Sequence, residues 1–106
     1  MMTRKHVTHF EIAGFTYYEG PIVFTQLKVG ASLQLVAEPE NKFDPNAVAI
    51  YFGEEKIGFI SREKNELFSL FFEQGYKNIF EAYINRLSPD AYPERQVGVA
   101  VYLKAR

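Results

Sequence analysis

The sequence predicts a mainly-β domain in which about six short strands form a small, closed or nearly closed barrel beside one main helix. Apolar residues alternate with polar ones in short segments that are separated by turn residues such as Gly, Pro and Asp. A single segment, 62–74, instead has apolar residues three and four apart, which is the period of an amphipathic helix. Closing the barrel would also hide the strand edges, which otherwise pair with other chains.

Length and composition fit one folded domain. The chain has 106 residues, of which 47% are apolar and 16% aromatic, a balance that excludes disorder. We expect one domain with its core at about 7–103, soluble and intracellular, since no leader and no run of ~20 apolar residues stands out. The absence of cysteine excludes disulfides and thiolate chemistry. A net charge of −1 argues against strong non-specific binding of polyanions but allows a local site.

The individual elements follow from local patterns. Gly14 predicts a bend near the end of the first strand, and 22–27 is either a short strand or a helical turn. Ser61 is the expected N-cap of the helix and Gly75 the residue that ends it, with the apolar stripe assigned to the core. That stripe comprises Leu67, Phe68, Leu70, Phe71 and Phe72. The strands are expected at 7–15, 33–37, 48–52, 56–60, 79–87 and 97–103.

One polar turn, 38–47, joins two apolar strands and holds the most informative residues. In Asp44-Pro45-Asn46 the Asp side chain can accept a hydrogen bond from the main chain two residues on, and Pro fixes φ. Taken alone, Asp44 is more simply a turn cap than a ligand group. Phe43 is unexpected, because a large ring at the tip of a polar loop buries little surface.

No arrangement of residues indicates catalysis. His6 and His9 are close in sequence, but residues i and i+3 of a strand face opposite sides, so we expect surface histidines rather than metal ligands. The serines lack a G-x-S-x-G context, and the acidic turn lacks the mid-loop Gly and terminal Glu of a calcium loop. We therefore predict no enzyme activity, no cofactor and no metal site.

Binding of a nucleic-acid strand is the better interpretation. Such a site needs aromatic faces for bases, a few cations for phosphates and an oriented polar group. Each aromatic candidate also fits a structural role. A residue on a strand suits the core, and adjacent tyrosines in an extended chain face opposite ways, so only one of them would line a site. The candidates are Tyr17, Tyr18, Phe43 and Phe59.

The sequence resembles the HIRAN domain in four stretches. The longest and most specific is Glu38-Pro39-x-Asn41-x-Phe43-Asp44-Pro45-Asn46-Ala47-Val48, with Ile57-Gly58-Phe59-Ile60 one strand later. Gly14-x-x-Tyr17-Tyr18 and Leu27-x-x-Gly30-x-x-Leu33 extend the resemblance, which runs over about 7–103. It independently implies a six-stranded OB-like β-barrel.

The resemblance also implies a function. The domain would be a non-enzymatic module, acting in DNA repair or replication, that holds the free 3′-hydroxyl end of single-stranded DNA. Asp44 would accept a hydrogen bond from the terminal hydroxyl and would repel a 3′-phosphate. Phe43 and one residue of the Tyr17-Tyr18 pair would hold the terminal base between them, and Arg62 would contact a phosphate.

Three positions depart from the family pattern. Thr16 stands where the family carries Arg, Phe43 replaces Tyr, and Phe59 replaces His, which removes one cation and two polar contacts. We therefore expect weak binding of single-stranded DNA, micromolar or worse. A protein partner would supply any enzymatic activity, and no membrane partner is expected. The alternative is a protein-interaction domain of the same fold that has lost DNA binding.

Overall fold

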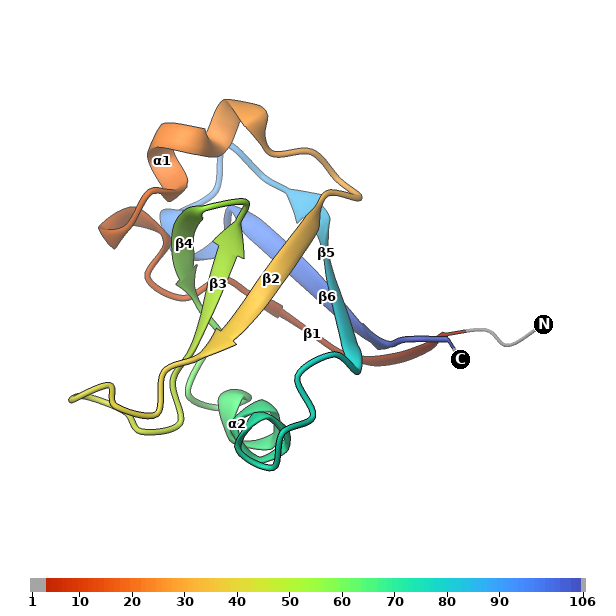
Figure 1. Cartoon of the computed structure of the whole chain (residues 1–106). Helices are drawn as coiled ribbons and strands as arrows, with labels where there is room; N and C mark the ends of the chain where they lie inside the picture. The colour runs from red at the N-terminus through yellow and green to blue at the C-terminus, as the bar shows by residue number, and fades with distance from the viewer. Residues whose placement is uncertain (1–3, 106) are drawn as a thin grey trace.

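The computed structural model describes residues 4–105 and, over that range, contains six strands and one main helix, as the sequence predicts (Figure 1). The strands are β1 (Lys5–Glu11), β2 (Ser32–Ala37), β3 (Val48–Phe52), β4 (Glu55–Phe59), β5 (Phe80–Leu87) and β6 (Val97–Leu103). The helices are α1 (Gly20–Val23) and α2 (Asn65–Glu73), with 3-10 turns η1 (Phe15–Tyr17), η2 (Phe24–Gln26) and η3 (Pro93–Arg95). No helix in this range is long and apolar enough to cross a membrane.

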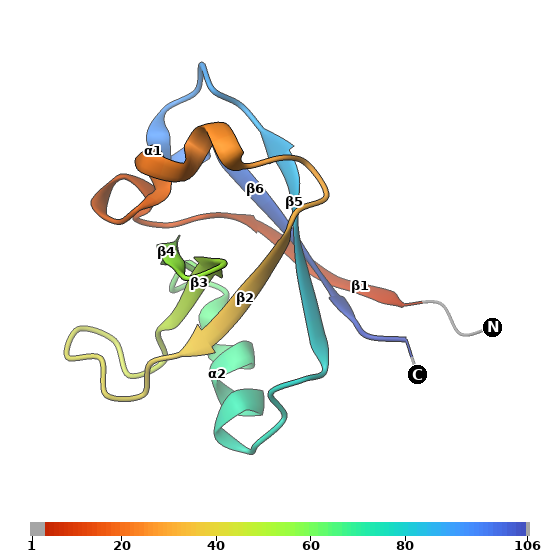
Figure 2. The same cartoon turned by 45° about the horizontal axis from the view of Figure 1, so that its top comes forward.

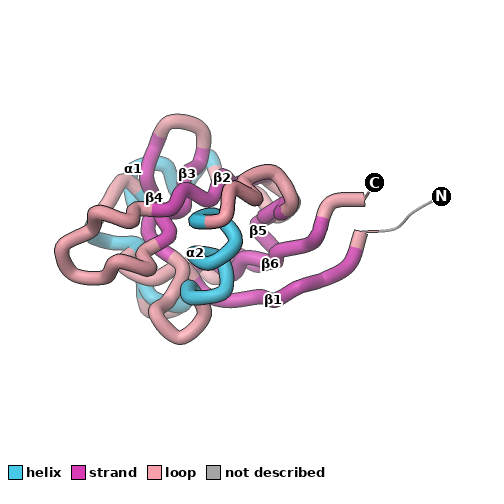
Figure 3. The backbone as a smooth tube through the Cα atoms, turned by 60° about the horizontal axis from the view of Figure 1, so that its bottom comes forward, coloured by secondary structure: helices cyan, strands magenta, loops and turns pink. Residues whose placement is uncertain are grey.

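The strands form one antiparallel sheet that curls upon itself in the order β1-β6-β5-β2-β3-β4 (Figure 2). Its two edges meet just beyond β1, where Ala13 and Phe59 exchange two main-chain hydrogen bonds of 2.9 Å. Helix α2 lies across one end of the curled sheet (Figure 3). The arrangement is a nearly closed barrel, joined at its edges by a single bridge between described residues.

The bridge depends on Gly58, which lies next to Phe59 in β4. Its φ of +149° is a conformation that side-chain-bearing residues rarely adopt. A Cβ at this position would lie 2.3 Å from Ile12 Cγ2 and 2.5 Å from the carbonyl oxygen of Ala13. Only a glycine therefore lets the segment after β1 approach β4 closely enough to hydrogen-bond with it.

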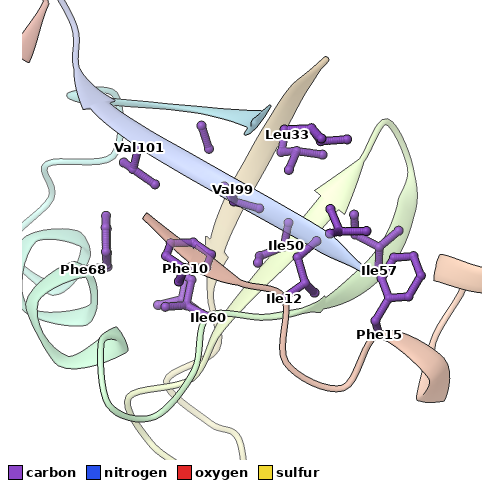
Figure 4. Packing of buried hydrophobic residues seen from close by; sticks show 14 of the residues in the cluster. Phe10, Ile12, Phe15, Leu33, Ile50, Ile57, Ile60, Phe68, Val99 and Val101 are labelled. Atoms are coloured by element: carbon purple, nitrogen blue, oxygen red, sulfur yellow. The ribbon is translucent and has the colours of Figure 1, made fainter. Parts of the chain in front are cut away.

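The core lies inside the curled sheet and is filled by the inward faces of the strands (Figure 4). Helix α2 adds Phe68 and Phe72, whose ring centroids lie 4.8 and 6.0 Å from that of Phe80. The predicted apolar stripe is wider than the buried one, because Leu67 and Leu70 remain 48% and 54% exposed. A helix of nine residues that contacts the barrel through positions four apart leaves those two leucines beyond the contact.

Helix α2 begins later than the sequence predicts and ends where expected. Ser61 is not its N-cap: residues 61–64 form a turn, in which the Lys64 N–H donates to the Ser61 carbonyl, and the helix starts at Asn65. The side chains of Arg62 and Lys64 bond to the carbonyls of Phe43 and His9, which holds this turn against the barrel. At the other end, Gly75 has φ +92° and terminates the helix.

The first third of the chain also differs in detail from the prediction. β1 ends at Glu11 instead of continuing to 15, and the undecided segment 22–27 is helical except for Leu27, which is extended. A bulge between His6 and Thr8 shifts the register of β1 against β6, so that His6 pairs with Tyr102 and His9 with Ala100. The two histidines therefore share one face, with ring centroids 5.6 Å apart. The expectation of opposite faces was wrong because it assumed a regular strand.

We predict that Gly58→Ala destabilises the fold by at least about 3 kcal/mol, since it adds steric overlap to backbone strain. Gly53→Ala is the matched control. Gly53 also has a positive φ, of +60°, but a Cβ there would meet nothing within 4 Å, so its cost should be about 1–2 kcal/mol. Urea denaturation measures both values. Equal losses would show that close approach at Gly58 does not hold the barrel edges together.

Candidate nucleic-acid interface

A pocket of about 310 Å³ opens where the edges of the sheet meet. Four separate segments line it: the loop after β1, the 38–47 loop, β4 with the turn that follows, and the start of α2. The structure brings every binding residue proposed from the sequence into this one pocket. These residues are Tyr17, Tyr18, Phe43, Asp44, Phe59 and Arg62.

The aromatic residues of the pocket fall into two groups. Tyr17 and Phe43 are 82% and 86% exposed, so both present ring faces to solvent. Tyr18 and Phe59 instead pack edge to face, with ring centroids 5.4 Å apart. The ammonium group of Lys56 lies against both of these rings, 4.9 and 4.4 Å from their centroids. The second group therefore forms a fixed wall, and the first offers free surface for stacking.

The structure corrects the expectation that only one tyrosine can face the site. Tyr17 ends the 3-10 turn η1, which follows a bend at Gly14, so the chain is not extended there. Both Tyr17 and Tyr18 line the pocket as a result. The prediction assumed the alternation of a β-strand, which does not apply to a turn of this kind.

The loop that carries Phe43 is tied down by Asn41. The side-chain oxygen of Asn41 accepts hydrogen bonds from the main-chain N–H groups of Phe43 and Asp44, at 2.9 and 3.1 Å. Its amide nitrogen donates to Glu38, which forms a 2.7 Å ion pair with Lys56. Partial burial would raise the pKa of Glu38, but the hydrogen bonds from Lys56 and Asn41 lower it overall.

Asp44 combines a turn role with a place in the pocket. Its Oδ1 accepts from the Asn46 N–H at 2.9 Å, the predicted turn contact, and its Oδ2 accepts from the Asn65 amide at 2.9 Å. These two bonds, with a smaller contribution from Arg62, hold the pKa of Asp44 below its usual value. The side chain is 18% exposed. Asp44 is therefore an ionised, acceptor-only group that remains reachable from the pocket.

Arg62 supplies the positive charge among the described residues that line the pocket. Its Nη2 donates to the Phe43 carbonyl at 2.9 Å, and its Nε lies 3.7 Å from Asp44 Oδ2. The side chain is 73% exposed, so part of the guanidinium stays free to meet a ligand. No three His, Asp or Glu side chains gather as metal ligands in the part of the chain that the structure describes.

The sequence matches the family described as the HIRAN domain over residues 5–106. The chain belongs to the HIRAN domain family. The fold of this HIRAN domain is similar to that of a protein from Lactobacillus plantarum, with a TM-score of 0.80, 19% identity, and 97% of each chain covered. It is also similar to the HIRAN domain of human HLTF, with a TM-score of 0.72 and 13% identity over 93% of this chain and 74% of the other. None of the curated proteins searched matches the chain.

Sequence reasoning missed three residues that shape the site of this HIRAN domain. Asn41 and Asn65 line the pocket, and Lys56 supports its aromatic wall. Asn41 lies within the motif that carries the family resemblance, so its position was a usable signal. Asn65 gave none, because its contact with Asp44 spans 21 residues and depends on where α2 begins.

We predict that Asn65→Ala raises the pKa of Asp44 more than Arg62→Gln does, because the hydrogen bond from Asn65 is direct whereas Arg62 is largely exposed. Since the folded-state pKa lies below the ordinary 3.8, the stabilising effect of Asp44 is present at neutral pH and is lost as pH falls through that lowered value. Carboxyl-carbon NMR titration measures the shifts. A larger rise in the Arg62→Gln variant would contradict this order.

Proposed function

We propose that this HIRAN domain is a non-enzymatic module that binds the free 3′-hydroxyl end of single-stranded DNA in the pocket beside β4. The observation that carries the proposal is the presence, in one pocket, of an ionised carboxylate, two exposed aromatic rings and one partly free guanidinium. These groups match the three needs of a strand terminus: a hydrogen-bond acceptor, a stacking surface and a phosphate contact.

The carboxylate of Asp44 has acceptor capacity beyond its bonds within the protein. An ionised carboxylate offers about four lone-pair sites, and hydrogen bonds from Asn46 and Asn65 use two of them. A terminal hydroxyl is a donor and can fill one of the remaining sites. A terminal phosphate is negatively charged and, when fully ionised, has no proton to donate. It would therefore be repelled by the carboxylate.

Stacking supports the same assignment. Tyr17 and Phe43 come from different loops, and both rings are more than four-fifths exposed within the pocket lining. Stacking on an aromatic side chain contributes about 1–3 kcal/mol per base and tolerates any sequence. The expected preference is therefore for the strand end rather than for a particular base.

Electrostatics indicates weak affinity. Arg62 is close to Asp44, which partly neutralises it, and Thr16 is exposed but carries no charge. A site with about one phosphate contact should show a shallow salt dependence, near −0.7 in log–log slope for a single strand. A complete lack of binding at low salt would favour the alternative, a protein-interaction domain with this fold.

We predict that the domain binds a short strand ending in a 3′-hydroxyl about tenfold to a hundredfold more tightly than the same strand ending in a 3′-phosphate. Fluorescence anisotropy with a 5′-labelled oligothymidine at low salt measures both affinities. Arg62→Ala should weaken the two ligands alike and flatten the salt dependence. Equal binding of the two strand ends by the intact protein would refute end recognition, even if both bind.

The variant Asp44→Asn tests the carboxylate directly. Asparagine keeps an acceptor for the Asn46 N–H, and the Asn65 amide can flip to accept from the new amide nitrogen, so we expect the fold to persist. The preference for the hydroxyl should fall to near unity, because the negative charge that rejects phosphate is gone. An unchanged preference in a folded Asp44→Asn protein would assign end discrimination to another group.

We further predict that Phe43→Ala and Tyr17→Ala each reduce affinity for both strand ends by about fivefold to a hundredfold, through loss of base stacking. Tyr92→Ala is the matched control, because Tyr92 is equally exposed, at 79%, but does not line the pocket. The same anisotropy titration reports all three variants. A loss in the control as large as in the pocket variants would mean that exposed aromatics bind DNA without a specific site.

A further inference from the structure

The barrel wall is incomplete between β2 and β5. These strands pair only at Ser32–Tyr83 and Leu33–Ala82. Beyond these pairs they diverge towards α2, as Figure 1 shows. The second half of β2 therefore has a hydrogen-bonded neighbour, β3, on one side only.

The unpaired side of β2 carries main-chain hydrogen-bonding groups. Main-chain groups point alternately to the two sides of a strand. The Glu38 N–H donates to Ala47 on the β3 side, so Val36 also faces β3. Leu35 and Ala37 consequently direct their N–H and C=O groups to the other side, where no residue of β5 pairs with them.

A groove follows this side of β2. It consists of two hollows of about 740 and 360 Å³ that share Leu35, Phe72, Lys77 and Asn78 in their linings. Phe80 lies beside Phe72, with ring centroids 6.0 Å apart, and the two rings form an apolar patch in a lining that also holds Lys77 and Asn78. A groove with an apolar patch and a free strand edge suits an extended chain, whose alternate side chains point the same way.

The residues of β2 at this edge carry none of the sequence features that commonly discourage strand addition. Edge strands in soluble proteins commonly carry Lys, Pro or a bulge. β2 has none of these between Gln34 and Ala37, and the exposed side chain of Val36 is apolar.

Charge at the groove indicates which kind of chain would fit. Lys77 lines both hollows and Lys104 only the one lined by β5, and neither makes an ion pair among the described residues. The nearby carboxylate of Glu81 is engaged by Arg4 at 3.6 Å. Glu73 lies in the other hollow. The β5 end of the groove is therefore complementary to acidic residues.

We propose that the free edge of β2 binds an extended segment of a partner protein, which adds a strand beside Leu35 and Ala37. Alternate apolar side chains of the segment pack on the Phe72–Phe80 patch, and acidic residues at the β5 end meet Lys104 and the nearby Lys77. The groove shares no lining residue with the pocket that holds Asp44, so a bound segment would not occupy the proposed DNA site.

The test uses the whole chain and two synthetic octapeptide probes. Each has six alternating valines and threonines and two aspartates. The aspartates lie at the N-terminus of one probe and at the C-terminus of the other. Anisotropy should show saturable binding of one probe. Hydrogen exchange should show rapid exchange at the amides of Leu35 and Ala37, slowed by that probe. Lys104→Glu should remove the difference in affinity between the two probes. Failure of both probes to bind at millimolar concentration would overturn the proposal.

Two matched pairs of changes, one pair in the probe and one in the protein, separate strand addition from non-specific binding. N-methylation of one alternate set of probe amides should abolish binding, whereas methylation of the other set should leave it within about twofold. On the protein, Ala37→Pro removes the free N–H and should reduce affinity at least about tenfold, and Ala37→Ser, which keeps it, should not. Equal effects of the two methylated sets would overturn strand addition. Dimerisation of the chain without peptide, abolished by Ala37→Pro, would replace the partner segment with a second copy.

Discussion

The pair of main-chain hydrogen bonds between Ala13 and Phe59 is the constraint on which the site depends. It fixes the loop that carries Tyr17 and Tyr18 against β4, and so determines that residues over forty positions apart share one pocket. Gly58 makes the approach possible, because any Cβ would overlap the facing main chain. The glycine of the Ile57-Gly58-Phe59-Ile60 motif thus has a structural role, while its neighbour Phe59 forms part of the pocket wall.

The opposite wall of the pocket, which is the 38–47 loop, is held in place by side-chain hydrogen bonds instead of by pairing between strands. Asn41 binds two main-chain N–H groups at the loop tip, Arg62 binds the Phe43 carbonyl, and Asn65 binds Asp44. These contacts come from the loop itself, from the turn after β4 and from α2. A ligand would therefore meet a loop already held in place, which reduces the entropy lost on binding. The late start of α2 belongs to this arrangement, since the turn before it carries Arg62.

The sequence predicted the fold well because strands and turns depend on short-range patterns. The residues that it proposed for binding lie in one pocket, and their role in binding stays a prediction. Alternation located the strands, and the motif of the 38–47 turn identified Phe43 and Asp44. Two failures have the same physical origin, which is local departure from ideal strand geometry. The bulge in β1 placed His6 and His9 on one face, and the turn at η1 placed both tyrosines in the lining of the pocket. Asn65 could not be found, because only tertiary contact brings it to Asp44.

The charge balance of the pocket bears on why the proposed ligand would be a strand end. Within a DNA strand every internal 3′-oxygen is esterified to a phosphate, so an internal nucleotide would bring negative charge to Asp44 and offer no donor. Only the 3′-terminal nucleotide would present a neutral hydroxyl there. Arg62 already bonds to the Phe43 carbonyl, so under this proposal its attraction for a phosphate would be too small to offset that repulsion. The uncharged Thr16 and the net charge of −1 would act in the same direction, lowering affinity for internal nucleotides together with overall affinity.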